Sequence, residues 1–153
     1  MKFYIEPPKD DNGYLDRMAR AIFEAGLSWK MVDNKWPAFK KVFHNFSVGK
    51  VAGLTKKEIK AMLNNDGIVR SEGKIMATIY NAQEFKKVKG EFGSFKSYMD
   101  TFKGSEARLK KDLQKRFKYL GPGNSRSFLW LAGVKLKPQQ DEIAWLTKIT
   151  ENK

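Results

Sequence analysis

The chain has 153 residues, of which 30 are Lys or Arg and 17 are Asp or Glu, so its formal net charge is +13. Cysteine is absent and His44 is the single histidine, which excludes disulfides, thiolate zinc sites, thiol nucleophiles and multi-histidine metal centres. No segment approaches the roughly 18 apolar residues that a membrane-spanning helix needs, and no signal peptide is evident at the start. We therefore expect one cytoplasmic domain over residues 1–153, without a metal or a cofactor.

Helical periodicity runs through most of the chain, and capping residues predict where the helices begin: Asp11 or Asn12, Ser28, Ser47, Thr55, Ser71, Ser94 and Ser105. The first helix is expected to end at Gly26, and the longest to run from Ser71 to about Lys89. The segment from Ser28 is expected to stop near Val32, because Pro37 favours the start of a separate helix.

Near the end of the chain, the sequence predicts a helix from Asn124 to about Ala132 and a last helix that begins at about Gln139. No alternating strand pattern occurs, so the fold class is predicted to be all-α. We expect two helical lobes around a central cleft.

The excess positive charge favours a polyanion as partner, either nucleic acid or an anionic membrane surface. A solvated, lysine-rich surface without a partner would give the same composition. The lysines are not segregated onto one apolar-backed face, which argues against a membrane. The lysine-rich helix that ends at Lys118 is a candidate track for a DNA backbone.

The segment Lys118-Tyr119-Leu120-Gly121-Pro122-Gly123 joins this basic helix to the next one by a tight turn. Backbone N–H groups at the start of a helix favour an anion, so the turn is a candidate phosphate cradle. Gly121 and Gly123 would allow a sugar-phosphate chain to approach closely and would permit positive φ. The side chains expected to reach phosphates are Lys118, Asn124, Ser125 and Arg126. An ordinary corner between two helices is the alternative.

This unit resembles the helix-hairpin-helix of the base-excision DNA glycosylase superfamily. In that superfamily a catalytic Asp commonly follows the second hairpin glycine by 20 residues, and Asp141 lies 20 residues after Gly121. Members that also cut the DNA strand carry a Lys nucleophile at the position that Gly123 occupies here. The resemblance therefore implies a monofunctional glycosylase with Asp141 as the catalytic carboxylate, opposite the sugar cation that develops and as base for the attacking water. The neighbouring Glu142 is the fallback.

A more specific resemblance, to the 3-methyladenine DNA glycosylase I family, covers roughly residues 4–128. The segments that carry it include Ala25-Gly26-Leu27-Ser28-Trp29, Phe43-His44-Asn45-Phe46, Asn65-Asp66-Gly67-Ile68-Val69-Arg70 and Phe117-Lys118-Tyr119-Leu120-Gly121-Pro122. The family's zinc ligands have no counterparts here, and the carboxylate that it places eight residues before Trp29 falls on Ala21. A descendant that binds DNA without catalysis is therefore the rival interpretation.

Trp29 is expected to line a pocket for an extruded alkylated purine, because aromatic faces hold a flipped base. The resemblance aligns Tyr4 with a family Trp near that pocket, and Trp36 is a further aromatic candidate. Leu27 is a candidate wedge in the base stack, and Leu120 belongs to the hairpin that contacts DNA. The alternatives are a core role for the aromatic residues, a helix staple for Leu27 and a helix cap for Asp141. Trp130 and Trp145 are assigned to the core. The expected partner is double-stranded DNA with a damaged base, bound by a nucleoid-associated monomer.

Overall fold

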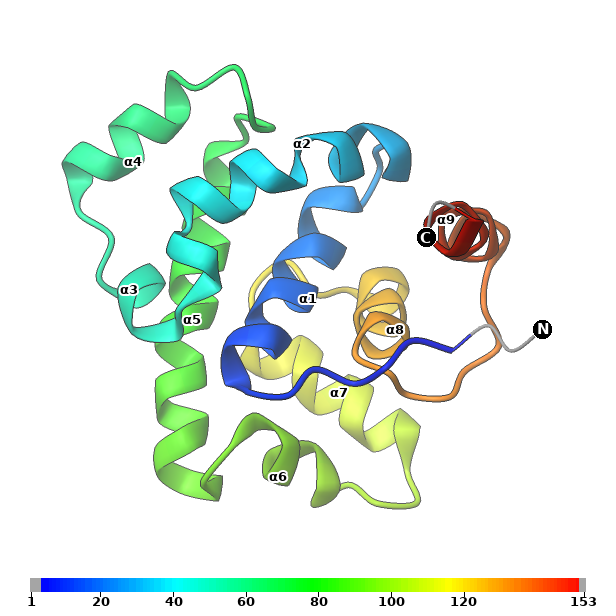
Figure 1. Ribbon diagram of the computed structural model, residues 1–153. Coiled ribbons are helices and arrows are strands. Elements are labelled where there is room, and N and C mark those ends of the chain that lie inside the picture. Colours follow the sequence, from blue (N-terminus) through cyan, green and yellow to red (C-terminus); the bar gives the residue numbers. More distant parts are fainter. Residues whose placement is uncertain (1–3, 152–153) are drawn as a thin grey trace.

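The computed structural model describes residues 4–151, and this part of the chain contains helices and no strand (Figure 1). The elements in chain order are α1 (Asp11–Glu24), α2 (Trp29–Val42), the 3-10 turn η1 (His44–Phe46), α3 (Val48–Ala52), α4 (Lys56–Leu63), α5 (Glu72–Phe92), α6 (Phe95–Asp100), α7 (Glu106–Arg116), α8 (Pro122–Leu131) and α9 (Gln140–Glu151). The predicted all-α class is confirmed.

Most of the helices begin where their capping residues predict. The side chains that accept a hydrogen bond from a first-turn N–H are Ser28, Thr55, Ser71, Ser94 and Ser105. Helix α1 differs, because Asp10 caps it by accepting from the N–H of Gly13 at 2.8 Å. Asp11 and Asn12 instead accept from the first N–H groups of α6 and α3, both at 2.9 Å. Asp11 and Asn12 therefore connect α1 to α6 and to α3, respectively, and do not cap α1.

Two helices are longer than the sequence predicts. Helix α2 continues through Pro37, so the expected break between two segments is wrong. Proline removes one backbone donor from a helix, and burial of Trp36 and Phe39 on either side of it offsets that loss. Helix α5 extends to Phe92 and ends at Gly93, whose φ of +89° is a conformation that glycine adopts readily.

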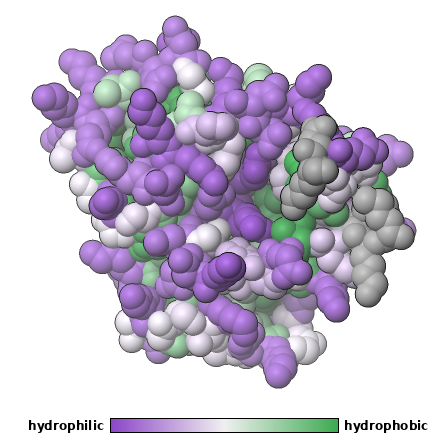
Figure 2. Space-filling view, viewed as in Figure 1, coloured by the Kyte–Doolittle hydropathy of each residue, from purple (hydrophilic) through white to green (hydrophobic). Residues whose placement is uncertain are grey.

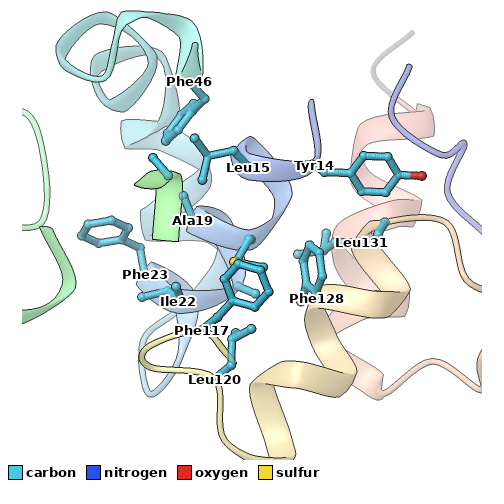
Figure 3. Packing of buried hydrophobic residues seen from close by; sticks show 14 of the residues in the cluster. Tyr14, Leu15, Ala19, Ile22, Phe23, Phe46, Phe117, Leu120, Phe128 and Leu131 are labelled. Carbon is cyan, nitrogen blue, oxygen red and sulfur yellow. The ribbon is translucent and has the colours of Figure 1, made fainter. Parts of the chain in front are cut away.

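Helix α1 lies at the centre of the fold and packs against both α5 and α8 (Figure 1). Its apolar side chains meet those of α8 and of the segment that precedes α8, as Figure 3 shows for Ile22, Phe117 and Phe128. The buried apolar residues form one continuous cluster from Tyr14 to Leu146. The core therefore holds the end of α1 and the start of α8 in fixed positions relative to each other.

Hydrophilic residues cover most of the face in Figure 2, and apolar residues show between them in smaller areas. The exposed large apolar side chains include Tyr80 on α5 and Tyr119 in the turn before α8. Within residues 4–151, no helix combines the length and the apolar character that crossing a bilayer requires.

Candidate functional site

The turn between α7 and α8 is held by Asn124, which lies in the first turn of α8. Its side-chain oxygen accepts a hydrogen bond from the N–H of Gly121 at 2.6 Å, and its side-chain amide donates to the carbonyl of Tyr119. Tyr119 itself has a φ of +62°, so the left-handed residue of the turn is not a glycine. Asn124, predicted to contact phosphate, is therefore engaged in shaping the turn.

The two glycines of the turn do not need positive φ, which corrects that expectation. Gly121 has a φ of −97° and Gly123 lies inside α8. A methyl group on Gly123 would meet no atom within 4 Å, and one on Gly121 would meet only a side-chain oxygen of Asn124 at 3.8 Å. The space beside both residues is open, so both stay candidates for close approach by a ligand.

Asn81 of α5 fixes the other end of this turn, a role that the sequence analysis did not assign. Its side-chain oxygen accepts from the N–H of Lys118 at 2.8 Å, and its amide donates to the carbonyl of the same residue at 3.1 Å. Asn81 is fully buried. A buried polar side chain that satisfies a loop backbone from both sides positions that loop.

We expect Asn81→Leu to lower the free energy of unfolding by about 2–4 kcal/mol, because two part-buried backbone groups of Lys118 lose the hydrogen bonds that the buried Asn81 side chain supplies. Asn64→Leu is the matched control: Asn64 is exposed and makes a single hydrogen bond to a backbone carbonyl, so its loss should cost less than about 1 kcal/mol. Urea unfolding measures both. Equal costs for the two variants would show that Asn81 does not position the turn.

Two residues that were predicted to contact DNA, Leu120 and Ser125, are buried, and a third, Arg126, is half-buried and paired within the protein. Leu120 belongs to the core, because apolar packing closes the base of the turn (Figure 3). Ser125 is fully buried, and its hydroxyl donates to the carbonyl of Pro122. The guanidinium of Arg126 pairs with Glu142 and donates to the carbonyl of Lys137. Burial of Leu120 and Ser125 and the internal partners of Arg126 argue against direct side-chain contacts with DNA at these three positions.

Lys118 and Leu27 lie at the surface, as a contact with DNA requires. The ammonium of Lys118 sits 4.2 Å from the ring centre of Tyr80, a cation-π contact that still leaves the lysine exposed. Leu27 is 37% exposed and follows Gly26, whose φ is +76°. Lys74 donates to the carbonyl of Ala25 at 3.0 Å and so holds this bend.

Two adjoining pockets lie between the end of α1, the start of α2, the first turns of α8 and the helix α9. We name the first the Trp145 pocket; it measures about 440 Å³ and is lined by Leu27, Ser28, Trp29, Lys30, Asp33, Asp141, Ala144, Trp145 and Lys148. The second, the Glu24 pocket, measures about 480 Å³ and is lined by Ala21, Glu24, Ala25, Gly26, Leu27, Trp29, Gly123, Asn124, Ser127, Gln139 and Asp141. Each is within the size range of small-molecule sites.

The structure brings Trp29, Leu27 and Asp141 together, because all three line both pockets. Trp29 makes edge contacts with Trp130 and Trp145, at ring-centre distances of 6.3 and 5.7 Å. These contacts orient its ring. Gly123 lines the Glu24 pocket as well, so the turn before α8 opens directly onto the place where Trp29 and Asp141 meet.

The other aromatic predictions need correction. Trp36 is 4% exposed, stacks on Phe39 and Phe46, and donates from its indole nitrogen to Asp16, so it belongs to the core. Tyr4 is exposed beside Lys135 and lines neither pocket. Trp145, which was assigned to the core, is half-buried and lines a pocket.

Asp141 and Glu142 have opposite environments at the start of α9. Glu142 is fully buried, accepts from the N–H of Gln139 at 2.7 Å and pairs with Arg126. Glu142 thus performs the capping that was considered for Asp141, and it lines neither pocket, which argues against the fallback assignment. The carboxylate of Asp141 is exposed and makes no hydrogen bond or ion pair with the described residues. It is free to act on a ligand.

Glu24 is a pocket residue that the sequence analysis missed. It lies one helical turn after Ala21, a spacing that places two residues on the same helix face and could have pointed to it. Glu24 is 3% exposed and accepts from the guanidinium of Arg20 at 2.9 Å. Burial is the main reason why the pKa of Glu24 rises to about 8, and the nearby Arg20 opposes that rise.

Within the described part of the chain, no three His, Cys, Asp or Glu side chains are close enough together to hold a metal ion. His44 lines neither pocket and pairs with Glu58 at 2.9 Å. The linings combine aromatic, amide and carboxylate side chains with small and apolar residues, and two lysines also line the Trp145 pocket. This set suits a flat, hydrogen-bonding ligand.

Known proteins are similar to this chain in sequence and in fold. DNA-3-methyladenine glycosylase 1 of Escherichia coli (strain K12) is 28% identical over 148 residues, which cover 84% of this chain and 79% of that protein. A structure of a 3-methyladenine DNA glycosylase I variant in complex with 3-methyladenine superposes with a TM-score of 0.77 at 27% identity, over 91% of this chain and 87% of that one.

The 3-methyladenine DNA glycosylase I of Staphylococcus aureus, whose structure addresses 3-methyladenine recognition, gives a TM-score of 0.76 at 28% identity, over 91% of this chain and 86% of that one. The sequence profile of the methyladenine glycosylase family matches residues 4–127, which is most of the chain. The resemblance inferred from the sequence is confirmed, and the protein belongs to the methyladenine glycosylase family.

Proposed function

We propose that this protein is a DNA glycosylase that excises alkylated purines of the 3-methyladenine type from double-stranded DNA. The observation that carries the proposal is the meeting of Trp29, Asp141 and Gly123 at one pocket, in a chain of the methyladenine glycosylase family. An aromatic wall, a carboxylate without a partner among residues 4–151 and an open helix start are the parts that base extrusion and N-glycosidic hydrolysis require.

Trp29 and Asp141 have different roles in this proposal. Trp29 stacks on the extruded base, and a positively charged base gains further from the electron-rich ring face. Asp141 places its negative charge beside the deoxyribose, where positive charge develops as the bond to the base breaks, and it accepts a proton from the attacking water. Because alkylation already makes the base a good leaving group, little acid catalysis is needed.

Abasic sites provide the direct test of this function. Methylated duplex DNA incubated with the protein should accumulate abasic sites that an aldehyde-reactive reagent labels, whereas unmethylated duplex should not. Equal labelling of the two substrates would contradict a role in alkylation repair.

The DNA backbone is proposed to approach the N–H groups at the start of α8. Gly123→Ala adds a methyl group into open space, so the protein should stay folded while the phosphate is pushed away. We expect duplex affinity to fall about tenfold or more, since a hydrogen bond to a charged group is worth about 1.5–3 kcal/mol. Fluorescence anisotropy with labelled duplex measures this change.

Gly90→Ala is the matched control. Gly90 also lies in a helix, α5, and a methyl group there would meet nothing within 4 Å. Both variants should keep or slightly raise stability, because alanine is the better helix former. Unchanged DNA affinity in Gly123→Ala would assign the α7–α8 turn to an ordinary corner between helices.

The strand should remain intact after base removal. Gly123 offers no amine at the position where strand-cutting relatives of the superfamily carry a lysine, so no Schiff base with the abasic sugar is expected. Borohydride added during the reaction should trap no protein–DNA adduct above background. A trapped adduct would show that another lysine performs lyase chemistry.

A non-catalytic DNA-binding protein is the second candidate, and Ala21 is the observation that favours it. The family carboxylate expected at this position is missing, and Ala21 contributes only a methyl group to the Glu24 pocket. Such a protein would bind methylated and unmethylated duplex alike and would generate no abasic sites, so the aldehyde assay separates the two candidates.

A further inference from the structure

A buried carboxylate lies in the wall of the Glu24 pocket. The side chain of Glu24 is 2% exposed, and one of its oxygens, Oε1, accepts from Nε of Arg20 at 2.9 Å. The other oxygen, Oε2, is buried and has no hydrogen-bond partner among the described residues. A buried carboxylate oxygen without a donor is costly. Its place in a pocket wall indicates that a ligand supplies the missing donor.

The charges around Glu24 favour a positively charged ligand. Arg20 on the same helix is shared with Asp33 of α2, and Glu142 of α9 adds a further negative charge whose own partner is Arg126. Burial first, and then repulsion from Asp33 and Glu142, raise the pKa of Glu24 to about 8 despite Arg20. A cation that entered the pocket would favour the ionised carboxylate.

The rest of the pocket fits a flat aromatic cation. Trp29 supplies a ring, and cations are attracted to the faces of tryptophan rings. Ala21, one turn before Glu24, leaves room beside the carboxyl group because its side chain is a single methyl. Ring stacking and a carboxylate at the ring edge together select for both shape and charge.

We propose that Glu24 is a specificity-determining residue, whose carboxylate accepts a hydrogen bond from an N–H group of a positively charged N-alkylated purine stacked on Trp29. This inference rests on the proposed function, because it requires an extruded base in the pocket. A neutral purine gains the stacking but not the interaction between charges. The protein therefore selects a cationic lesion over a neutral base at this residue.

Ligand binding should release a proton from Glu24. Because its carboxyl group is largely protonated below pH 8, the affinity for a permanently charged ligand should rise with pH, by about tenfold per unit, until it levels off near pH 8. A residue that only supports the fold would leave ligand affinity independent of pH in this range.

Calorimetric titration of the intact protein with two small probes tests the inference. The 3,9-dimethyladeninium ion carries the fixed charge of a methylated nucleotide, and 9-methyladenine is its neutral counterpart. Glu24→Gln keeps the shape of the side chain and should weaken binding of the cation at least tenfold at pH 8. Binding of the neutral probe should change less than about twofold, and proton release should disappear.

Asp33→Asn provides the matched comparison, since it removes a charge from the same ion-pair cluster but not from the Glu24 pocket. Asp33→Asn should weaken binding of the 3,9-dimethyladeninium ion by less than Glu24→Gln does. Equal losses in the two variants, or wild-type affinity of Glu24→Gln for the cation, would overturn the inference. Abasic-site formation by the wild-type protein is scored separately, so a glycosylase that does not use Glu24 and a protein without glycosylase activity give different results.

Discussion

Asp141→Asn should lower the rate of base release by about 10²–10⁴-fold, the range typical for loss of a positioned catalytic carboxylate. The substitution keeps the size of the side chain but removes the negative charge next to the developing sugar cation. Duplex affinity should change little, because the side chain is exposed and has no partner among the described residues. Single-turnover release of labelled base from methylated duplex measures the rate.

Glu151→Gln is the control for this experiment, because it removes an exposed charge from the same helix, α9, at the opposite end. Its release rate should equal that of the wild-type protein. If Asp141→Asn kept the wild-type rate, the catalytic role would have to move to another carboxylate of the cleft, with Glu24 the next to test.

Arg126→Met should lower the free energy of unfolding by about 3–5 kcal/mol, because it leaves the fully buried carboxylate of Glu142 without its cation. The pair also joins α8 to the start of α9, so the variant should lose base-release activity through misplacement of Asp141. Urea unfolding gives the stability change, and the release assay gives the loss of activity.

The double variant Arg126→Met/Glu142→Gln separates these effects. Glutamine removes the buried charge but retains an acceptor for the N–H of Gln139, so the double variant should recover most of the lost stability. A cost below about 1 kcal/mol for Arg126→Met alone would mean that the pair behaves as an exposed ion pair and does not anchor α9.

Local signals in the sequence predict the helices well. A cap such as Ser71 or the box of Thr55 and Glu58 acts within four residues, so it can be recognised without knowledge of the tertiary fold. Pro37 shows the limit of this reasoning. Its local preference for a helix start is outweighed by the burial of Trp36 and Phe39, which depends on distant parts of the chain.

For the candidate site, too, local sequence signals predict some features, while others depend on contacts between distant parts of the chain. Trp29 and Asp141 are 112 residues apart in the sequence, and the resemblance to a family suggested that they meet, as they do at both pockets. The neighbours of Arg126 in sequence favour a phosphate contact, and its pairing with Glu142 could not be predicted because Glu142 comes from another helix. Tyr4 and Trp36 have suitable side chains but the fold carries them elsewhere.

Identification of the released base by mass spectrometry is the decisive test of base excision by this protein. Methylated duplex DNA, incubated with the protein and then filtered, should yield free 3-methyladenine as the main product, with far less released by Asp141→Asn. Release of unmodified bases in the same proportion, or of no base at all while the protein binds the duplex, would contradict excision of cationic purines at the cleft formed by Trp29, Asp141 and Glu24.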